Sequence, residues 1–189
     1  VKKNWINSGD NNNNNILYSE ISNGMSYTFG RNNHNFGFSY SDRNIINASF
    51  SDDLLRIAFE GNFHHQNRTL DFGGTSIRAD RFQQYTFSYK TSIKKVKIST
   101  SFSYLSGNHH LSYIIKEGSL YTAPFGTSLD ITYEMSALVT DTASLSPFEH
   151  NGNGLAIGLN TEFQFKEHTV SFSFSDFGFI MWDPSSITL

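Results

Sequence analysis

The chain has 189 residues, a formal net charge of −3 and no cysteine, which excludes a disulfide framework and thiolate metal sites. Its one short basic run, Lys94–Lys97, is too small for a nucleic-acid partner, whose binding needs clustered Lys and Arg. Aromatic residues make up 15% of the chain and charged residues only 16%, against roughly 25% charged in ordinary soluble domains. Part of the surface is therefore expected to face something other than water.

The N-terminal part predicts a loop followed by two strands. Residues 1–15 end in an Asn run and are expected to form a flexible terminus or loop. Apolar residues then recur with the spacing of a strand, and a turn over residues 31–35 separates two such segments. The residues of the two apolar faces are Leu17, Ile21, Met25, Tyr27 and Phe29, and then Phe36, Phe38 and Tyr40.

The next stretch predicts irregular structure. Asp52 and Asp53 precede two leucines and are typical of the N-terminus of a short helical turn. A long polar loop is expected over residues 67–81, with a sharp backbone turn at Gly73 and Gly74. His64 and His65 are adjacent, so on a strand they would point to opposite faces and could not chelate one metal ion together. We therefore expect solvent-exposed loop histidines, no metal and no cofactor.

Two strands joined by a tight hairpin are predicted over residues 84–104. Tyr85, Phe87 and Tyr89 alternate with polar residues, and the pattern resumes at Val96 after only two lysines. Phe102 lies on the apolar face of the second strand. Each segment reaches the roughly 9–11 residues that a tilted strand needs to cross a bilayer.

The C-terminal half repeats this pattern. Residues 129–139 and 155–165 alternate in the same way, and a turn over residues 166–169 leads to a last strand that begins at Val170. The phase slips at Asp176, as a β-bulge produces, and Gly178 belongs to the same irregularity. Residues 184–189 are expected to be a tail or the start of a further segment.

The whole pattern favours an all-β fold, an antiparallel transmembrane β-barrel or a section of a larger one, over residues 16–183. Roughly eight strands are expected, with short turns alternating with long loops such as residues 140–154, which is the outer-membrane layout. A soluble sandwich also alternates apolar and polar residues. Here, however, the polar faces hold Ser, Thr, Gly, Asn and Gln rather than Lys, Glu and Arg. The predicted lipid-facing residues are Tyr85, Phe87, Tyr89, Phe102, Ile131, Tyr133, Leu159, Phe163 and Phe172.

Several short motifs resemble the FadL-like outer-membrane proteins, in particular uncharacterised members from Bacteroidota-type bacteria. The resemblance covers about residues 36–183. The motifs are Asp53–Leu55, Phe59–Asn62, Asp71–Gly74, Tyr85–Tyr89, Phe102–Gly107 and Phe174–Trp182.

What the resemblance implies is a channel for small or hydrophobic solutes in a bacterial outer membrane. Members of that family form a barrel with more strands than this chain supplies, and the chain ends without the terminal aromatic residue common in such barrels. We therefore expect the first and last strands, near residues 17–29 and 170–181, to pair with other strands rather than with each other. Unpaired edges in lipid would leave backbone groups unsatisfied.

His110 and Ser112 form the only candidate catalytic pair. Residues two apart on a strand point the same way, and outer-membrane lipases use a His and a Ser so placed. No orienting acid is identifiable, and Gly107 with Asn108 predicts a turn just before the pair, where His109 and His110 would be exposed. We therefore predict no enzyme activity and no catalytic residues.

The resulting hypothesis is an outer-membrane barrel that acts as a channel or transporter. It could instead be a subunit of a larger outer-membrane complex, with membrane lipid and other outer-membrane proteins as its partners. A soluble β-sandwich interaction module is the alternative, and a lipase-type enzyme is a further one.

Overall fold

One antiparallel sheet dominates the computed structural model, which describes residues 15–140, 149–183 and 187–188. The sheet has nine strands, and seven of them have 11 or more residues. The predicted all-β class is therefore correct. The long strands are β1 (Asn15–Arg31), β2 (His34–Phe50), β4 (Ser76–Ile93), β5 (Val96–Thr122), β6 (Leu129–Val139), β7 (Gly152–Phe165) and β8 (His168–Trp182). The short elements are α2 (Asp52–Glu60), η1 (Phe63–His65), β3 (Thr69–Asp71), η2 (Pro124–Gly126) and β9 (Ile187–Thr188).

Strand β5 pairs with two different strands along one of its edges. Its first half pairs with β7, which in turn pairs with β8, whereas its second half pairs with β6 on the same side. On its other side β5 pairs with β4 and then with β3. Six strands therefore run side by side at one end of the sheet, in the order β1, β2, β4, β5, β7 and β8.

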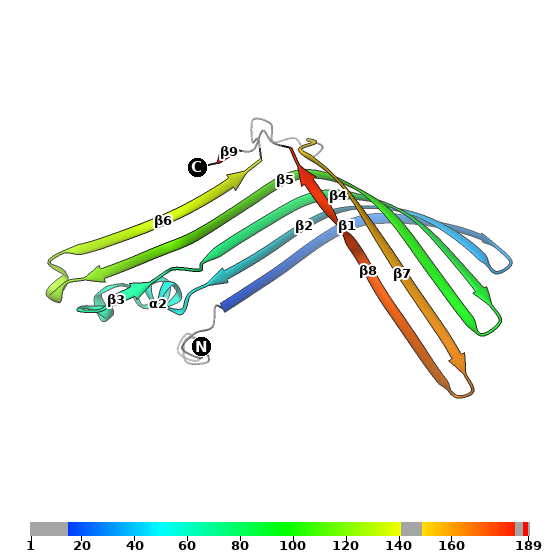
Figure 1. Cartoon of the computed structure of the whole chain (residues 1–189), viewed down its shortest axis with the longest axis horizontal. Coiled ribbons are helices and arrows are strands. Elements are labelled where there is room, and N and C mark those ends of the chain that lie inside the picture. Colours follow the sequence, from blue (N-terminus) through cyan, green and yellow to red (C-terminus); the bar gives the residue numbers. More distant parts are fainter. Residues whose placement is uncertain (1–14, 141–148, 184–186, 189) are drawn as a thin grey trace.

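Three two-residue turns close the hairpins at that end of the sheet (Figure 1). They join β1 to β2, β4 to β5 and β7 to β8, and the residues Asn32, Lys94 and Lys166 in them have φ between 54° and 57°. Positive φ is what a tight hairpin turn requires. The predicted turns at residues 31–35, 94–95 and 166–169 are therefore confirmed. The connections from β2 to β4, from β5 to β6 and from β6 to β7 are longer.

Two long loops that the sequence predicts overlap strands. Residues 67–81 contain β3, and β4 already starts at Ser76. The charged residues that suggested a loop there form ion pairs on the strand, Arg78 with Asp80 and Arg81 with Asp42. Likewise β7 starts at Gly152, inside the loop predicted over residues 140–154, of which residues 141–148 lie outside the described part.

The turn predicted at Gly107 and Asn108 is wrong, because β5 continues through both residues. Gly107 pairs with Phe82 and His109 with Arg81, so Asn108 is an extra residue at a bulge. Gly107 is a glycine for a packing reason, since an added Cβ would lie 2.5 Å from Cζ3 of Trp182. These two residues therefore form a bulge within a continuous strand.

The register assembles complete rows of side chains across the six strands. One row is entirely apolar and consists of Tyr27, Phe38, Phe87, Phe102, Ile157 and Phe177. The neighbouring row points to the other face and consists only of small residues, Ser26, Ser39, Thr86, Ser103, Ala156 and Gly178. Because side chains alternate between faces along each strand, the sheet has one apolar and one small, polar face.

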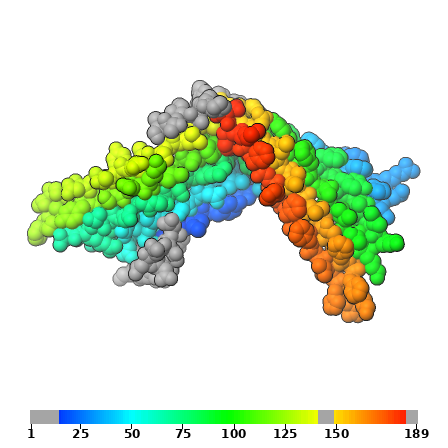
Figure 2. Space-filling view, viewed as in Figure 1, coloured from blue at the N-terminus to red at the C-terminus, as the bar shows by residue number. Residues whose placement is uncertain are grey.

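The sheet is strongly bent, and the polar face is its concave side. Figure 2 shows the molecule as a bent plate rather than a closed cylinder. The buried apolar residues Phe82, Leu105 and Ala156 form a small cluster on the concave side, with Ile45 and Ile180 against it. Apart from this cluster, large apolar side chains are mostly exposed on the convex face.

The described strands do not close into a barrel. Strand β1 pairs only with β2 and strand β8 only with β7, so neither edge meets the other within residues 15–140, 149–183 and 187–188. The expectation that the first and last strands do not pair with each other is therefore confirmed. Residues 1–14 and most of residues 184–189 lie outside the described part, but Asn15 starts β1 and β9 pairs with β6. No described helix is long and apolar enough to span a membrane.

Candidate functional site

A polar network on the concave face gathers residues from strands at both edges of the six-strand unit. Its anchor is Asp176, at the point where the sequence pattern changes phase. Ile157 pairs with Phe177 and Leu159 with Phe174, so Ser175 and Asp176 together face Gly158. Asp176 has φ 54°, a conformation that Asp tolerates better than most residues. The bulge directs its carboxylate over the concave face.

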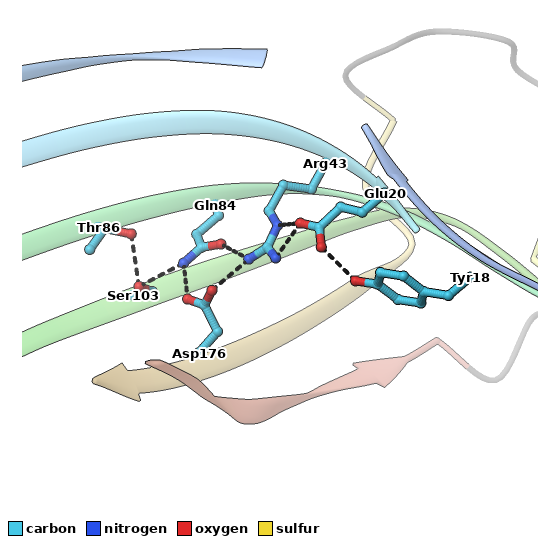
Figure 3. Close-up of polar contacts among 7 residues, drawn as sticks. All are labelled: Tyr18, Glu20, Arg43, Gln84, Thr86, Ser103 and Asp176. Atoms are coloured by element: carbon cyan, nitrogen blue, oxygen red, sulfur yellow. Dashed lines mark hydrogen bonds and ion pairs between the residues drawn. The ribbon is translucent and has the colours of Figure 1, made fainter. Parts of the chain in front are cut away.

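Arg43 of β2 lies at the centre of this network (Figure 3). Its Nη1 donates to Oδ2 of Asp176 and to Oε1 of Gln84, both at 2.8 Å. Its Nε donates to Oε1 of Glu20 at 2.9 Å, and the guanidinium lies 5.5 Å from the centre of the Phe82 ring. The Arg43 side chain is only 16% exposed. One guanidinium therefore joins two carboxylates from β1 and β8.

Neutral side chains extend the network along β4 and β5. The Gln84 amide nitrogen donates to Oδ1 of Asp176 at 2.8 Å and to Oγ of Ser103 at 3.1 Å. Ser103 also shares a hydrogen bond with Thr86. At the other end, the Tyr18 hydroxyl donates to Glu20. These partners satisfy the groups that burial removes from water, so the network is preorganised.

A pocket of about 290 Å³ opens beside the network. It has a charged side formed by Arg43, Asp176, Arg78 and Asp80, and an apolar side that includes Phe82 and the small cluster described above. A site of this mixed character can accommodate a small solute with a polar end and an apolar end.

A second cluster lies next to the pocket and was not predicted from the sequence. Nδ1 of His110 is 2.6 Å from Oδ1 of Asp80, and the imidazole stacks on Trp182 with ring centres 5.0 Å apart. His110 is 7% exposed and lies in β5, so the expectation of an exposed loop histidine there is wrong. The reason is that β5 continues through Gly107, where the sequence pattern predicts a turn.

The candidate pair His110 and Ser112 now has the acid that the sequence did not reveal, because Asp80 faces His110. Among the described residues, however, no hydrogen bond joins His110 to Ser112. The His110 ring instead contacts Asp80 and stacks on Trp182. A nucleophile needs its base within hydrogen-bond reach. We therefore expect the purified protein to hydrolyse p-nitrophenyl butyrate at the rate of a buffer blank, and Ser112→Ala to leave that rate unchanged. A signal lost in Ser112→Ala would instead place the protein among hydrolases.

The predicted lipid-facing residues lie on the convex side of the sheet or on its continuation into β6. Phe87 and Phe102 are each 51% exposed, Ile131 is 62% and Tyr133 is 67% exposed. Phe163 and Phe172 are also exposed, whereas Tyr85, Tyr89 and Leu159 are half-buried by neighbouring side chains. Gly178 follows the bulge and pairs with Ala156.

The other candidate residues have structural roles. Asp52 and Asp53 occupy the first turn of α2, but the capping side chain is Ser51, which accepts from the Leu54 amide. His65 contacts Glu60 at 2.9 Å, and His64 is exposed. Across the described residues, no three His, Asp or Glu side chains are placed to hold a metal ion together.

Fold and site together define a protein built on one strongly curved antiparallel sheet, with an apolar convex face and a polar network inside the curve. The chain belongs to a family of unknown function, DUF5723, whose family model matches residues 2–187. No match was found among curated proteins or among solved structures.

Proposed function

We propose that this chain forms part of the wall of a transmembrane β-barrel in a bacterial outer membrane. In this proposal the convex face contacts lipid and the concave face lines a lumen through which small or hydrophobic solutes pass. The observation that carries it is the apolar row across all six strands, whose members are 47–74% exposed. Soluble monomers rarely expose a contiguous apolar surface of this extent.

The height of the apolar surface fits a membrane. Along β5 it runs from Val96 near the turn to Tyr104. The next convex row is polar in five of its six members, Asn23, Asp42, Gln83, Ser106 and Asn153, and its sixth member is Met181. Nine residues at about 3.3 Å each give roughly 30 Å along the strand, which a tilt of roughly 40° reduces to about 23 Å. The apolar band of outer-membrane barrels is about 25 Å tall.

The charges support the boundary of this band at the short turns. Residues 152–161 of β7 and 98–115 of β5 contain no Asp, Glu, Lys or Arg. Lys94, Lys95, Lys166 and Glu167 gather at the short turns beyond one end of this band. Charged side chains on the lipid face are costly at the bilayer centre and tolerated near its surfaces.

A second candidate function is favoured by the two sheet edges. The outer edges of β1 and β8 lack a partner among the described residues, and a strand edge in lipid must be paired. A role as a subunit of a larger outer-membrane complex would supply that pairing. The FadL-like resemblance supports the channel function instead.

The test is fractionation of the native protein from its own cells, followed by reconstitution into planar lipid bilayers. We expect the protein in the outer-membrane fraction, released by detergent but not by carbonate washing, and we expect ion conductance after reconstitution. Recovery of a stable, monodisperse protein in buffer without detergent would contradict the proposal. Membrane insertion without conductance would favour the subunit function.

A further inference from the structure

The contact between Arg43 and Asp176 measures how tightly the wall curves. Their strands β2 and β8 are four steps apart in the sheet, with β4, β5 and β7 between them. At about 4.8 Å per step, this separation is roughly 19 Å along the sheet. The two side chains nevertheless meet at 2.8 Å. Side chains from such distant strands can converge only inside a tight curl.

A curl this tight narrows the open space at the level of the network to the pocket of about 290 Å³ beside Arg43 and Asp176. Barrels of about eight strands have an interior that side chains fill, whereas barrels of 16 or more leave an aqueous channel. Here Gln84 and Phe82 are each 7% exposed and Ser103 is 2% exposed beneath Arg43. The network therefore occupies the cross-section inside the curve between β2 and β8.

The network also carries a net charge. Glu20 and Asp176 face a single guanidinium, so the group has a formal charge of −1. Charged side chains at a constriction decide which ions pass, and acidic ones favour cations. Loss of one carboxylate would remove this preference, and loss of the guanidinium would strengthen it.

We propose that Arg43, held between Glu20 and Asp176, forms the constriction of the lumen, and that the surplus negative charge of the two carboxylates makes passage through it cation-selective. This inference rests on the proposed channel function. In it, the bulge at Asp176 serves to place a carboxylate where it locks Arg43 across the curve. A substitution of either carboxylate frees the Arg43 side chain, and a substitution of Arg43 removes it. Both changes widen the passage.

The experiment compares Asp176→Asn and Arg43→Gln with the wild type in planar bilayers. Both variants are expected to raise single-channel conductance several-fold. Their reversal potentials in a salt gradient are expected to move in opposite directions, toward weaker cation preference in Asp176→Asn and toward stronger preference in Arg43→Gln. A shared loss of stability would not produce opposite shifts.

A matched control comes from the neighbouring strands β2 and β4. Asp42 and Arg81 form an ion pair of the same type at 2.8 Å, but they belong to the convex face. Asp42→Asn and Arg81→Gln are expected to leave conductance and reversal potential unchanged. Should Arg43→Gln fail to assemble, Glu20→Gln replaces it and is expected to shift the reversal potential in the same direction as Asp176→Asn.

The outcomes separate this inference from the function on which it rests. A wild-type protein that does not insert into bilayers overturns the channel function. If the wild-type protein conducts, and Asp176→Asn and Glu20→Gln have the same conductance and selectivity as the wild type, the proposed constriction is wrong. Conductance changes of equal size in the convex-face control variants would also overturn it.

Discussion

Phe102→Arg is expected to abolish stable membrane assembly, whereas Ser101→Arg leaves most of it intact. Phe102 is 51% exposed on the convex face, and its row neighbours Phe87 and Ile157 are apolar. Arg on the lipid face near the bilayer centre costs roughly 2–4 kcal/mol. Ser101 points into the curve, where its neighbour Gly158 has no side chain. Assembly is measured as the amount of folded protein in the outer-membrane fraction.

One further variant refines this prediction. Phe163→Arg is expected to be milder than Phe102→Arg, because Phe163 pairs with Val96 beside the turn and the cost falls toward the bilayer surface. Equal yields for Phe102→Arg and Ser101→Arg would show that the convex face does not contact lipid.

Gly178→Val is expected to destabilise the protein strongly. An added Cβ would lie 2.6 Å from Cα of Ala156 and would contact the carbonyl oxygen of Leu155, so the backbone of β7 or β8 would have to move. Overpacking typically costs about 1–3 kcal/mol, and a clash with backbone atoms belongs to the upper part of that range. The measurement is chaotrope-induced unfolding in detergent micelles, followed by circular dichroism.

The control for this variant is Ser173→Val. Ser173 lies on the same strand and pairs with Asn160, and both residues are exposed. The substitution enlarges the side chain without meeting a backbone atom, so a small effect is expected. If both variants unfolded at the same chaotrope concentration as the wild type, β7 and β8 would not approach each other closely at Gly178.

The row of small residues that contains Gly178 fits the close approach of β7 and β8 at that position. A curled sheet crowds the side chains on its concave face and spreads those on its convex face. Along this row the side chains become smaller from Thr86 and Ser103 to Ala156 and Gly178. The opposite row holds Phe102, Ile157 and Phe177, which have room on the outside.

The sequence by itself determined the local structure of this protein. Alternation with period two requires strands, and two-residue connections such as Lys94–Lys95 require hairpins, because both depend only on neighbouring residues. The phase slip at Asp176 is local in the same sense. A local pattern is misleading where a distant residue is its cause. Gly107 and Asn108 have the composition of a turn, but Gly107 accommodates Trp182, which is far away in the sequence.

The tertiary structure alone decided which residues meet on the concave face. Period two assigns each side chain to one of two faces, but it contains no information on how strongly the sheet curves or which strands border each other. Arg43 and Asp176 are 133 residues apart, and Asp80 and His110 belong to strands whose register depends on the bulge at Asn108. Because curvature and register arise from the packing of all six strands together, the network and its central guanidinium became visible only in the folded sheet.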